Sequence, residues 1–283
     1  MLKTYYLLTK PGIIMGNAIT TASAFFLASK GHVDFILFLA TVAGLGGIIG
    51  SACVCNNYID RESDAKMVRT KNRPLPKGLI SGKKALIFAA MLGSAGALVL
   101  GIFTNVLALT VALFGFFIYV VLYSFWKYKT YYATLVGSIA GAVPPVVGYC
   151  AVSHHLDFGA VLLFAILVLW QMPHFFAIAM YRFNDYVAAS IPLLPIKKGA
   201  QATKIQMLLY IMGFTLVALL LTPLGYTGKI VLVSAALLGF AWLILCLKGF
   251  KVANDRQWAR KMFVLSLVII TIFSVTISID AIL

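Results

Sequence analysis

Nine long apolar runs, separated by short polar segments, constrain this chain more than any other feature of its sequence. They lie at residues 12–29, 35–56, 85–103, 105–125, 133–153, 158–180, 205–223, 228–247 and 262–280. About 20 consecutive apolar residues in a helix span the hydrocarbon core of a bilayer. A backbone inside lipid must satisfy its hydrogen bonds internally, as helices do. The sequence therefore predicts an all-α polytopic membrane protein with nine transmembrane helices.

The composition excludes several other classes of protein. Hydrophobic residues make up 62% of the 283 residues and charged residues only 11%, whereas a soluble domain carries about 45–50% apolar and about 25% charged residues. A soluble enzyme, a disordered chain and a disulfide scaffold are therefore excluded. The four cysteines match no zinc or disulfide spacing, so we interpret them as small core residues. We expect one integral membrane domain over residues 1–283.

The net charge of +15 would suit a nucleic-acid-binding protein, but the basic residues are distributed as in a membrane protein. Only Lys30 and Lys229 lie on one side of the nine runs. The other 21 of the 23 basic residues lie at the N-terminus and in segments 57–84, 126–132, 181–204 and 248–261. Cytoplasmic segments are enriched in Lys and Arg. We therefore predict a cytoplasmic N-terminus, an external C-terminus and no nucleic-acid partner.

A polar and acidic cluster follows the second apolar run. On a helix, Asn56, Asp60 and Asp64 are four residues apart and share one face. Two like charges one turn apart repel, and a divalent cation would reverse the sign of that interaction. Carboxylate and amide oxygens suit Mg²⁺. A solvated helix end balanced by Arg61 and Lys66 explains the same pattern without a ligand.

Three further observations favour a binding site. The cluster adjoins a membrane span, where carboxylates are costly and tend to be functional. Basic residues follow it, among them Arg69, Arg73 and Lys77, and Asp185 stands at the corresponding end of the sixth run. Magnesium flanked by Arg and Lys, opening into lipid, is what a lipid diphosphate requires. An apolar bundle would also keep water away from an allylic carbocation.

Several segments resemble one family along nearly the whole chain. Residues 56–64 (NNYIDRESD) and 70–75 (TKNRPL) resemble the first aspartate motif of the UbiA-type intramembrane prenyltransferases. Signatures of the heme-modifying branch of that family resemble residues 141–149 (GAVPPVVGY), 170–175 (WQMPHF) and 185–192 (DYVAASIP). Two positions depart from the wider family pattern, because Asn57 and Ala189 stand where Asp is common. The second departure is shared with the heme-modifying branch.

The resemblance implies a fold, a reaction and its participants. The fold is nine helices around a central cavity, in the bacterial cytoplasmic (inner) membrane with the site on the cytoplasmic side. The reaction joins the farnesyl group of farnesyl diphosphate to a vinyl group of heme b, with addition of water, giving heme O and diphosphate. Mg²⁺ is the implied cofactor. Membrane lipid surrounds the chain, and assembly factors of terminal oxidases are candidate partners.

Two other hypotheses stay open at this point. One is a prenyltransferase that acts on another aromatic acceptor, such as a quinone precursor. The other is a transporter without enzymatic activity, which would also have nine helices and buried polar residues. A transporter would not need paired Asp residues beside a cluster of basic residues on one side of the membrane.

The resemblance, together with the spacing above, gives a set of candidate site residues. The expected catalytic residues are Asp60, Asp64, Asp185 and His174. The expected metal ligands are Asn56, Asp60, Asp64 and Asp185. The expected diphosphate-binding residues are Arg69, Arg73, Lys77, Tyr123, Lys127 and Arg182. The expected heme and prenyl pocket comprises Asn17, Pro144, Pro145, Tyr149, Trp170 and His174.

Two of these expectations depend on helix geometry. On one continuous helix, His174 and Asp185 would point the same way, with Arg182 nearby. Iron ligation, proton transfer and water orientation are all open roles for His174, and a hydrogen-bonded core histidine is the structural alternative. We also expect the pair Pro144-Pro145 to interrupt the fifth run and widen the cavity.

Overall fold

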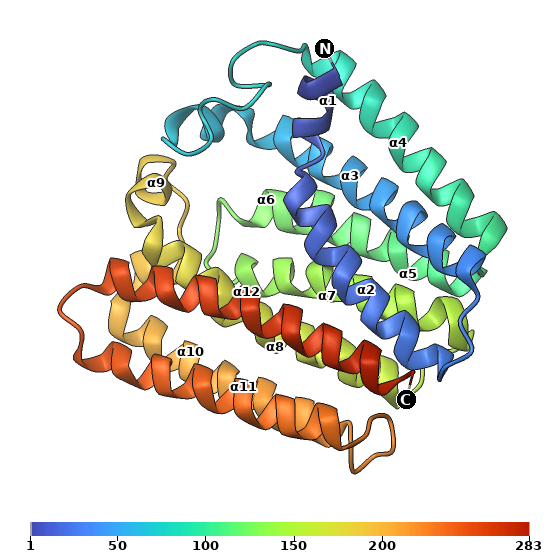
Figure 1. The fold of residues 1–283 in the computed structure, drawn as a ribbon. Coiled ribbons are helices and arrows are strands. Elements are labelled where there is room, and N and C mark those ends of the chain that lie inside the picture. The colour runs from blue at the N-terminus through green and yellow to red at the C-terminus, as the bar shows by residue number, and fades with distance from the viewer. Residues whose placement is uncertain (1, 283) are drawn as a thin grey trace.

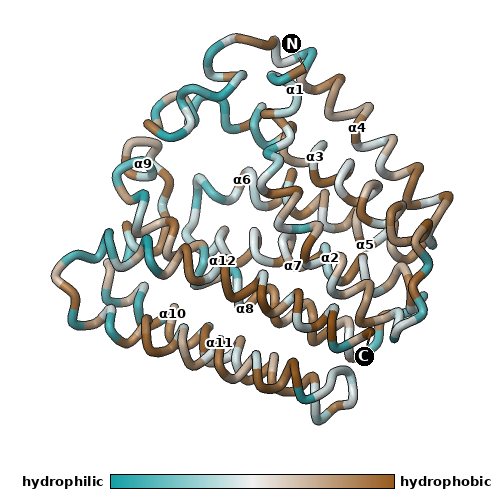
Figure 2. Tube along the Cα trace, viewed as in Figure 1, coloured by the Kyte–Doolittle hydropathy of each residue, from teal (hydrophilic) through white to brown (hydrophobic). Residues whose placement is uncertain are grey.

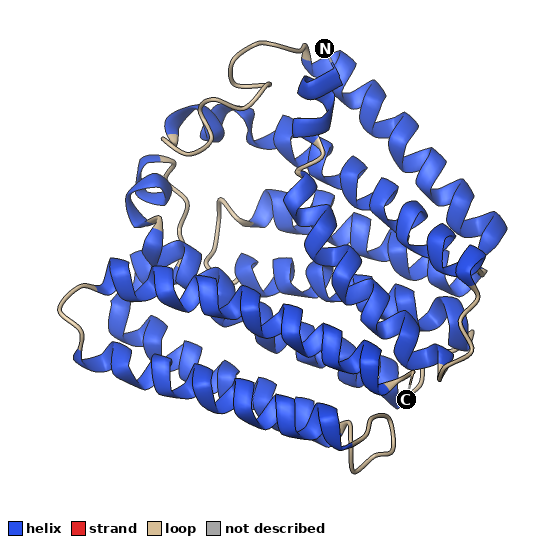
Figure 3. Ribbon diagram, in the orientation of Figure 1, coloured by secondary structure: helices blue, strands red, loops and turns tan. Residues whose placement is uncertain are grey.

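The computed structural model describes residues 2–282, and every regular element in that range is a helix (Figure 3). Nine helical spans within residues 2–282 are long and apolar enough to cross a membrane, which confirms the predicted class and count. They are α2 (Pro11–Ser29), α3 (Phe35–Lys66), α4 (Gly82–Phe103), the span Val106–Trp126, α7 (Ala133–Ser153), α8 (Phe158–Tyr181), α10 (Leu194–Leu220), the span Lys229–Lys251 and α12 (Asp255–Asp280).

Two of the spans combine several elements, and two short helices lie outside the spans. The span Val106–Trp126 consists of α5 (Val106–Phe117), the π-helix η1 (Ile118–Tyr123) and α6 (Ser124–Trp126). The span Lys229–Lys251 consists of α11 (Lys229–Lys248) and the 3₁₀ turn η2 (Gly249–Lys251). The short helices are α1 (Leu2–Leu8) and α9 (Phe183–Ala188).

Polar side chains begin five of the long helices. Asp34, Asn105 and Asp157 accept backbone N–H groups in the first turns of α3, α5 and α8. Ser81 and Asn254 do the same for α4 and α12. Each such cap satisfies a donor that has no partner within the helix, and contributes about 1 kcal/mol. The apolar runs therefore begin at fixed points of the chain.

Three helices extend beyond the apolar runs from which they were predicted. α3 continues to Lys66, whereas its run ends at residue 56; α10 begins at Leu194 instead of 205, and α12 at Asp255 instead of 262. An apolar run measures the thickness of the hydrocarbon layer and not the length of the helix. The added turns all lie at the basic side of the bundle, and those of α3 carry the acidic cluster.

Figure 1 shows α4 and α11 at opposite outer edges of the bundle, with the other long helices between them. Side chains from α2, α3, α5, η1, α7, α8 and α12 line a central cavity. α4 packs on the outside of α3, and α10 and α11 pack behind α8 and α12. Apolar side chains such as Leu98 and Phe240 are exposed on the outer helices, as expected for a surface in contact with lipid. Figure 2 shows hydrophilic residues gathered at the end of the bundle that holds the N-terminus and α9.

Glycines allow α3 and α4 to approach each other closely. A Cβ atom at Gly96 of α4 would lie 2.5 Å from the carbonyl oxygen of Gly44 and 2.8 Å from the nitrogen of Ile48 on α3. Small residues at such contacts let helix backbones pack directly in membranes. Because the atoms in the way belong to the backbone of α3, α3 and α4 would have to separate to admit even a methyl group.

We therefore expect Gly96→Ala to destabilise the protein by about 1–3 kcal/mol, which is the usual cost of overpacking. Thermal unfolding of the purified protein in detergent measures this change. Gly101→Ala on the same helix is the matched control, because Gly101 is exposed and a Cβ atom there would come no closer than 3.4 Å to Leu109. A Gly96→Ala protein as stable as the Gly101→Ala protein would show that the close approach does not limit stability.

The two termini lie at opposite ends of the bundle (Figure 1), as nine spans require. The distribution of Lys and Arg predicts that the C-terminus is external. Alkaline phosphatase folds only after export, so we expect it to be active when fused after residue 283 and inactive when inserted at residue 71. The opposite pattern of activities would reverse the orientation.

Candidate active site

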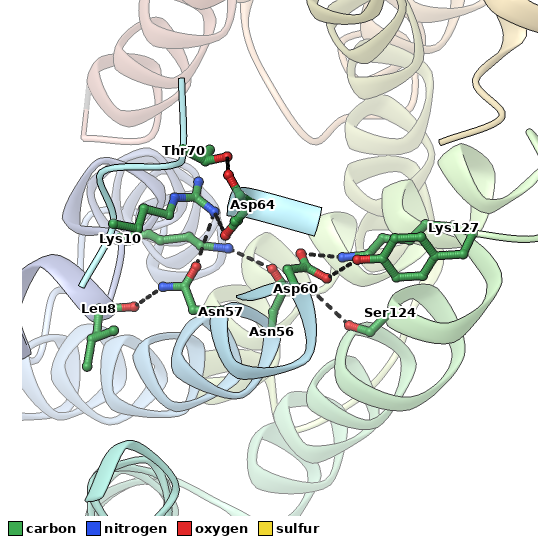
Figure 4. A network of polar contacts seen from close by, with 11 residues as sticks. Leu8, Lys10, Asn56, Asn57, Asp60, Asp64, Thr70, Ser124 and Lys127 are labelled. Atoms are coloured by element: carbon green, nitrogen blue, oxygen red, sulfur yellow. Dashed lines mark hydrogen bonds and ion pairs between the residues drawn. The ribbon is translucent and has the colours of Figure 1, made fainter. Parts of the chain in front are cut away.

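The cluster predicted on α3 forms one wall of the central cavity. Asn56, Asp60 and Asp64 all line this cavity, which has a volume of about 520 Å³. This volume is in the usual range for small-molecule sites. α3 is helical through all three positions, so the predicted common face is confirmed. Figure 4 shows the side chains of this cluster and their polar partners.

Each carboxylate of the cluster is paired with a cation from another segment. Asp60 accepts from Lys127, and its second oxygen accepts from the hydroxyl of Tyr128 at 2.7 Å. Asp64 Oδ2 lies 2.6 Å from Arg73 Nη1, and the Asp64 side chain is only 2% exposed. Burying a carboxylate is costly unless it is paired and hydrogen-bonded. These partners explain how two acidic groups one turn apart are tolerated.

The two asparagines connect α3 to the N-terminal segment. Asn56 Oδ1 accepts from Lys10 Nζ at 2.6 Å, and its amide nitrogen donates to Ser124 Oγ at 3.1 Å. Asn57 donates to the carbonyl oxygen of Leu8 at 2.8 Å and accepts from Arg73 at 3.3 Å. A carboxylate has no hydrogen to give to a carbonyl oxygen. The contact with Leu8 therefore accounts for an amide at position 57, where the wider family commonly has Asp.

The charges that line the cavity do not balance. Lys10, Arg69, Arg73 and Lys127 carry positive charge, and only Asp60 and Asp64 carry negative charge, so two positive charges are in excess. Burial lowers the pKa of Lys10 to about 8. Burial also lowers the pKa of Lys127, although Asp60 acts in the opposite direction. An anionic ligand would restore the preference of both groups for the charged form.

A π-helix shapes the wall opposite α3. Tyr119 and Tyr123 both belong to η1 and line the cavity, with ring centroids 5.4 Å apart and an interplanar angle of 16°. The Ser124 hydroxyl donates to the carbonyl oxygen of Tyr119 at 3.0 Å. π-helical turns are uncommon and are often found at functional sites. Lys127 follows within one turn, which brings its ammonium group to Asp60.

A second group of predicted residues lies deeper in the same cavity. Trp170 and His174 of α8 line it and stack at 4.9 Å. The His174 Nδ1 atom is 2.7 Å from Ser266 Oγ, and the Trp170 indole donates to the carbonyl oxygen of Ser266 at 2.8 Å. Asn17 also lines the cavity, as predicted. The structure therefore brings the candidate pocket and the acidic cluster into one space.

The prolines of the fifth run do not interrupt it, so that expectation is wrong. α7 is helical from Ala133 to Ser153 with Pro144 and Pro145 inside it. The Thr21 hydroxyl oxygen lies 3.3 Å from the carbonyl oxygen of Pro144, so a side chain of α2 contacts the helix at this point. Pro144 lines the cavity, whereas Pro145 is buried outside its lining. Tyr149 is also outside the lining, and its hydroxyl donates to Asp157.

The expected alignment of His174 with Asp185 is also wrong, because no continuous helix joins them. α8 ends at Tyr181 and α9 begins at Phe183, so the helical register is lost at Arg182. Asp185 accepts the backbone N–H of Val68 at 3.0 Å. It lines a separate pocket together with Arg182, while its neighbour Tyr186 faces the central cavity.

Asp185 and Arg182 therefore lie apart from Asp60 and Asp64, and their assigned roles stay predictions. Lys77 also lies outside the cavity lining and is exposed. Arg69, Arg73, Tyr123 and Lys127 do line the cavity. Their role in binding a diphosphate likewise stays a prediction.

Some residues of the site carry no signal in the sequence. Lys10, Tyr128 and Ser266 lie at least 46 residues away from the predicted residues that they contact. Lys, Tyr and Ser residues are common in membrane proteins. These three acquire their partners only because segments that are distant in sequence pack together. The residue pattern predicted the acidic groups and the cations Arg73 and Lys127, but not these three further partners.

The donor set fits a magnesium ion that brings other ligands with it. Asn56, Asp60 and Asp64 offer oxygen atoms to the cavity. No group of three His, Cys, Asp or Glu residues suited to a metal occurs within residues 2–282. Mg²⁺ usually keeps several waters and binds one or two carboxylates together with substrate phosphates. Two carboxylates and an amide beside four cations match that chemistry, and do not match an all-protein cage.

Known proteins resemble this chain along its whole length. A protoheme IX farnesyltransferase of Protochlamydia amoebophila (strain UWE25) is 55% identical over 280 residues, covering 99% of each chain. Another protein with that name, from Sodalis glossinidius (strain morsitans), is 52% identical over 282 residues, covering 99% of this chain and 95% of its own.

Solved structures and a family description agree with these relatives. A digeranylgeranylglyceryl phosphate synthase superimposes with a TM-score of 0.82 at 20% identity, covering 99% of this chain and 98% of its own. A UbiA homolog from Aeropyrum pernix K1 superimposes with a TM-score of 0.78 at 18% identity, covering 95% of this chain and 98% of its own. The UbiA prenyltransferase family matches residues 17–268. The chain belongs to the UbiA prenyltransferase family.

Proposed function

We propose that this chain transfers the farnesyl group of farnesyl diphosphate to a vinyl group of heme b, with addition of water, to give heme O and diphosphate. The observation that carries this proposal is the single cavity that holds two carboxylates, four cations and an apolar, aromatic interior. Relatives named protoheme IX farnesyltransferase, 52–55% identical over 99% of the chain, support heme as the acceptor.

The charged residues of the cavity suit a diphosphate. Arg69, Arg73 and Lys127 offer donors to phosphate oxygens, and the planar guanidinium groups can bind two oxygens at once. Asn56, Asp60 and Asp64 would hold Mg²⁺, which supplies positive charge to the leaving diphosphate. A UbiA homolog from Archaeoglobus fulgidus, similar in fold with a TM-score of 0.67, is described as bound to DMAPP and Mg²⁺.

The ion pairs of the site allow the cations to change partners on binding. Arg73 and Lys127 now neutralise Asp64 and Asp60. A diphosphate would attract the same cations, and the carboxylates would be freed to act as ligands. Cations held in place in this way stabilise the negative charge that develops on the leaving group. The fixed positions of the donors also avoid reorganisation at the moment of reaction.

The reaction then needs an environment without water until the last step. The C1–O bond of farnesyl diphosphate breaks, and its electron pair leaves with the diphosphate. The vinyl group attacks the farnesyl cation through its terminal carbon, and the cation formed beside the porphyrin ring captures water and loses a proton. Apolar side chains such as Ile48, Leu167 and Ile270 line the cavity and hold the prenyl chain. They exclude water from the first cation.

The location of the site follows from the distribution of charge. Lys10, Arg69, Arg73 and Lys127 belong to segments on the basic side of the nine spans. The positive-inside rule places that side in the cytoplasm. We therefore propose that the chain works in the bacterial inner membrane and takes its diphosphate substrate from the cytoplasmic side.

A product assay tests the acceptor directly. We expect purified protein with farnesyl diphosphate, heme b and Mg²⁺ to form a product whose mass equals heme b plus one farnesyl group and one hydroxyl group. EDTA should abolish formation of this product, because the diphosphate would lose its metal. A quinone precursor offered in place of heme b serves as the competing acceptor. Prenylation of that acceptor but not of heme b would overturn the proposal.

Asp60 tests the charged end of the cavity. We expect Asp60→Asn to lower the rate of farnesyl transfer at least about 100-fold, since the variant loses a carboxylate facing the leaving group. Glu62→Gln is the matched control, because Glu62 lies on the same helix, is 82% exposed and pairs only with Arg61. Size-exclusion profiles in detergent show whether each variant is folded. A folded Asp60→Asn enzyme with normal activity would contradict the assignment.

A further inference from the structure

His174 is held from three sides inside the central cavity. It is 8% exposed and lies in α8, about two helical turns inside the end of the helix at Tyr181. Its ring lies 4.9 Å from the Trp170 ring and 5.1 Å from the Phe263 ring, measured between centroids. The third contact is the hydrogen bond between Nδ1 and Ser266 Oγ at 2.7 Å. The ring therefore has one fixed position.

The hydroxyl of Ser266 lies between two groups that can share its hydrogen bonds. Ser266 Oγ is 2.7 Å from His174 Nδ1 and 2.7 Å from the carbonyl oxygen of Phe263. When the hydroxyl donates its one hydrogen to that carbonyl oxygen, it accepts from the imidazole. In this arrangement Nδ1 of His174 carries the hydrogen, and in the neutral ring Nε2 keeps a free lone pair.

The second ring nitrogen of His174 has no partner in the part of the protein that the structure describes. Within residues 2–282, no protein group forms a hydrogen bond with His174 Nε2. In the same range, the fully buried side-chain atoms without a partner belong to Trp242 and Asp255, so Nε2 is not one of them. His174 lines the cavity beside Trp170, Phe175 and Ile178. We infer that Nε2 is accessible to a ligand in the cavity.

The three other histidines of the chain are placed differently. His32, His154 and His155 are exposed in the loops between α2 and α3 and between α7 and α8. Those loops lie on the side of the bundle opposite to the acidic cluster. Among the four histidines, only His174 combines a cavity position, a hydrogen bond at Nδ1 and, within the described residues, no protein partner at Nε2. Histidines that ligate metals usually donate their second nitrogen to a neighbouring acceptor in this way.

We propose that Nε2 of His174 is the axial ligand of the iron of heme b in this cavity, and that Ser266 positions it by holding Nδ1–H. The proposal rests on heme being the acceptor, as proposed above. Ligation would fix the porphyrin at a depth below the diphosphate site, because Asp60 lies beyond the apolar part of α3 and His174 lies inside α8. A porphyrin held through its iron would have its vinyl groups at a fixed distance from the diphosphate site.

Binding measurements on the full-length protein in lipid nanodiscs test the ligation. The probes are ferric heme b and protoporphyrin IX without iron. We expect wild-type protein to give an imidazole-ligated iron spectrum and to bind heme b more tightly than the iron-free porphyrin. His174→Ala should lose that spectrum and bind heme b at least about 10-fold more weakly. Its affinity for the iron-free porphyrin should be unchanged, since only the iron–nitrogen bond is removed.

Ser266 supplies a variant that tests the positioning. Ser266→Ala removes the hydroxyl but keeps the backbone carbonyl that holds Trp170. We expect about 10-fold weaker binding of heme b and unchanged binding of the iron-free porphyrin, within the usual range for a lost outer-shell partner. Ser266→Thr retains a hydroxyl and should restore most of the affinity. The double variant His32→Ala and His155→Ala should behave as wild type.

Two controls make the result decisive. Added imidazole should restore the iron spectrum of His174→Gly, because the ligand can then enter from solution. The proposal is overturned if wild type and His174→Ala give the same iron spectrum, or if His174→Ala weakens both porphyrins equally. The proposed function fails separately: wild type that shows histidine ligation but forms no farnesylated heme would contradict that function and leave the ligation standing.

Discussion

The pairing of two carboxylates with two cations at the end of α3 is the interaction on which the rest of this structure depends. Asp60 pairs with Lys127, which follows α6, and Asp64 pairs with Arg73, which lies in the loop after α3. Asp64 and Lys127 are buried, and Asp60 and Arg73 are partly buried. Removing one partner of a buried pair leaves a charge uncompensated, at a cost of about 3–5 kcal/mol. The pairs therefore hold the basic loops against the acidic helix end.

The same ion pairs explain how the site can be stable and still be able to bind an anion. Burial lowers the pKa values of Lys10 and Lys127. A diphosphate would compensate their charge better than one carboxylate does, because it offers several oxygens to several donors. The cavity residues carry an excess of two positive charges, so an anionic ligand would reduce this imbalance.

The membrane spans could be predicted from sequence because lipid imposes a simple rule on length and polarity. The face shared by Asn56, Asp60 and Asp64 could be predicted too, since it needs only the helical repeat. Prediction failed where the chain leaves the regular helix. The break at Arg182 separates Asp185 from His174, and two prolines failed to interrupt α7. Partners such as Lys10, Tyr128 and Ser266 could not be predicted, because long-range packing alone determines them.

The contact between α8 and α12 shows how buried polar groups can both join two helices and position side chains of the cavity. Ser266 accepts from Trp170 through its carbonyl oxygen, and its hydroxyl is hydrogen-bonded to Nδ1 of His174. One residue therefore fixes two cavity side chains, and both bonds cross between the same two helices. Neither bond uses Nε2 of His174, a residue that lines the cavity. The contact that joins α8 to α12 therefore leaves one ring nitrogen available to a ligand.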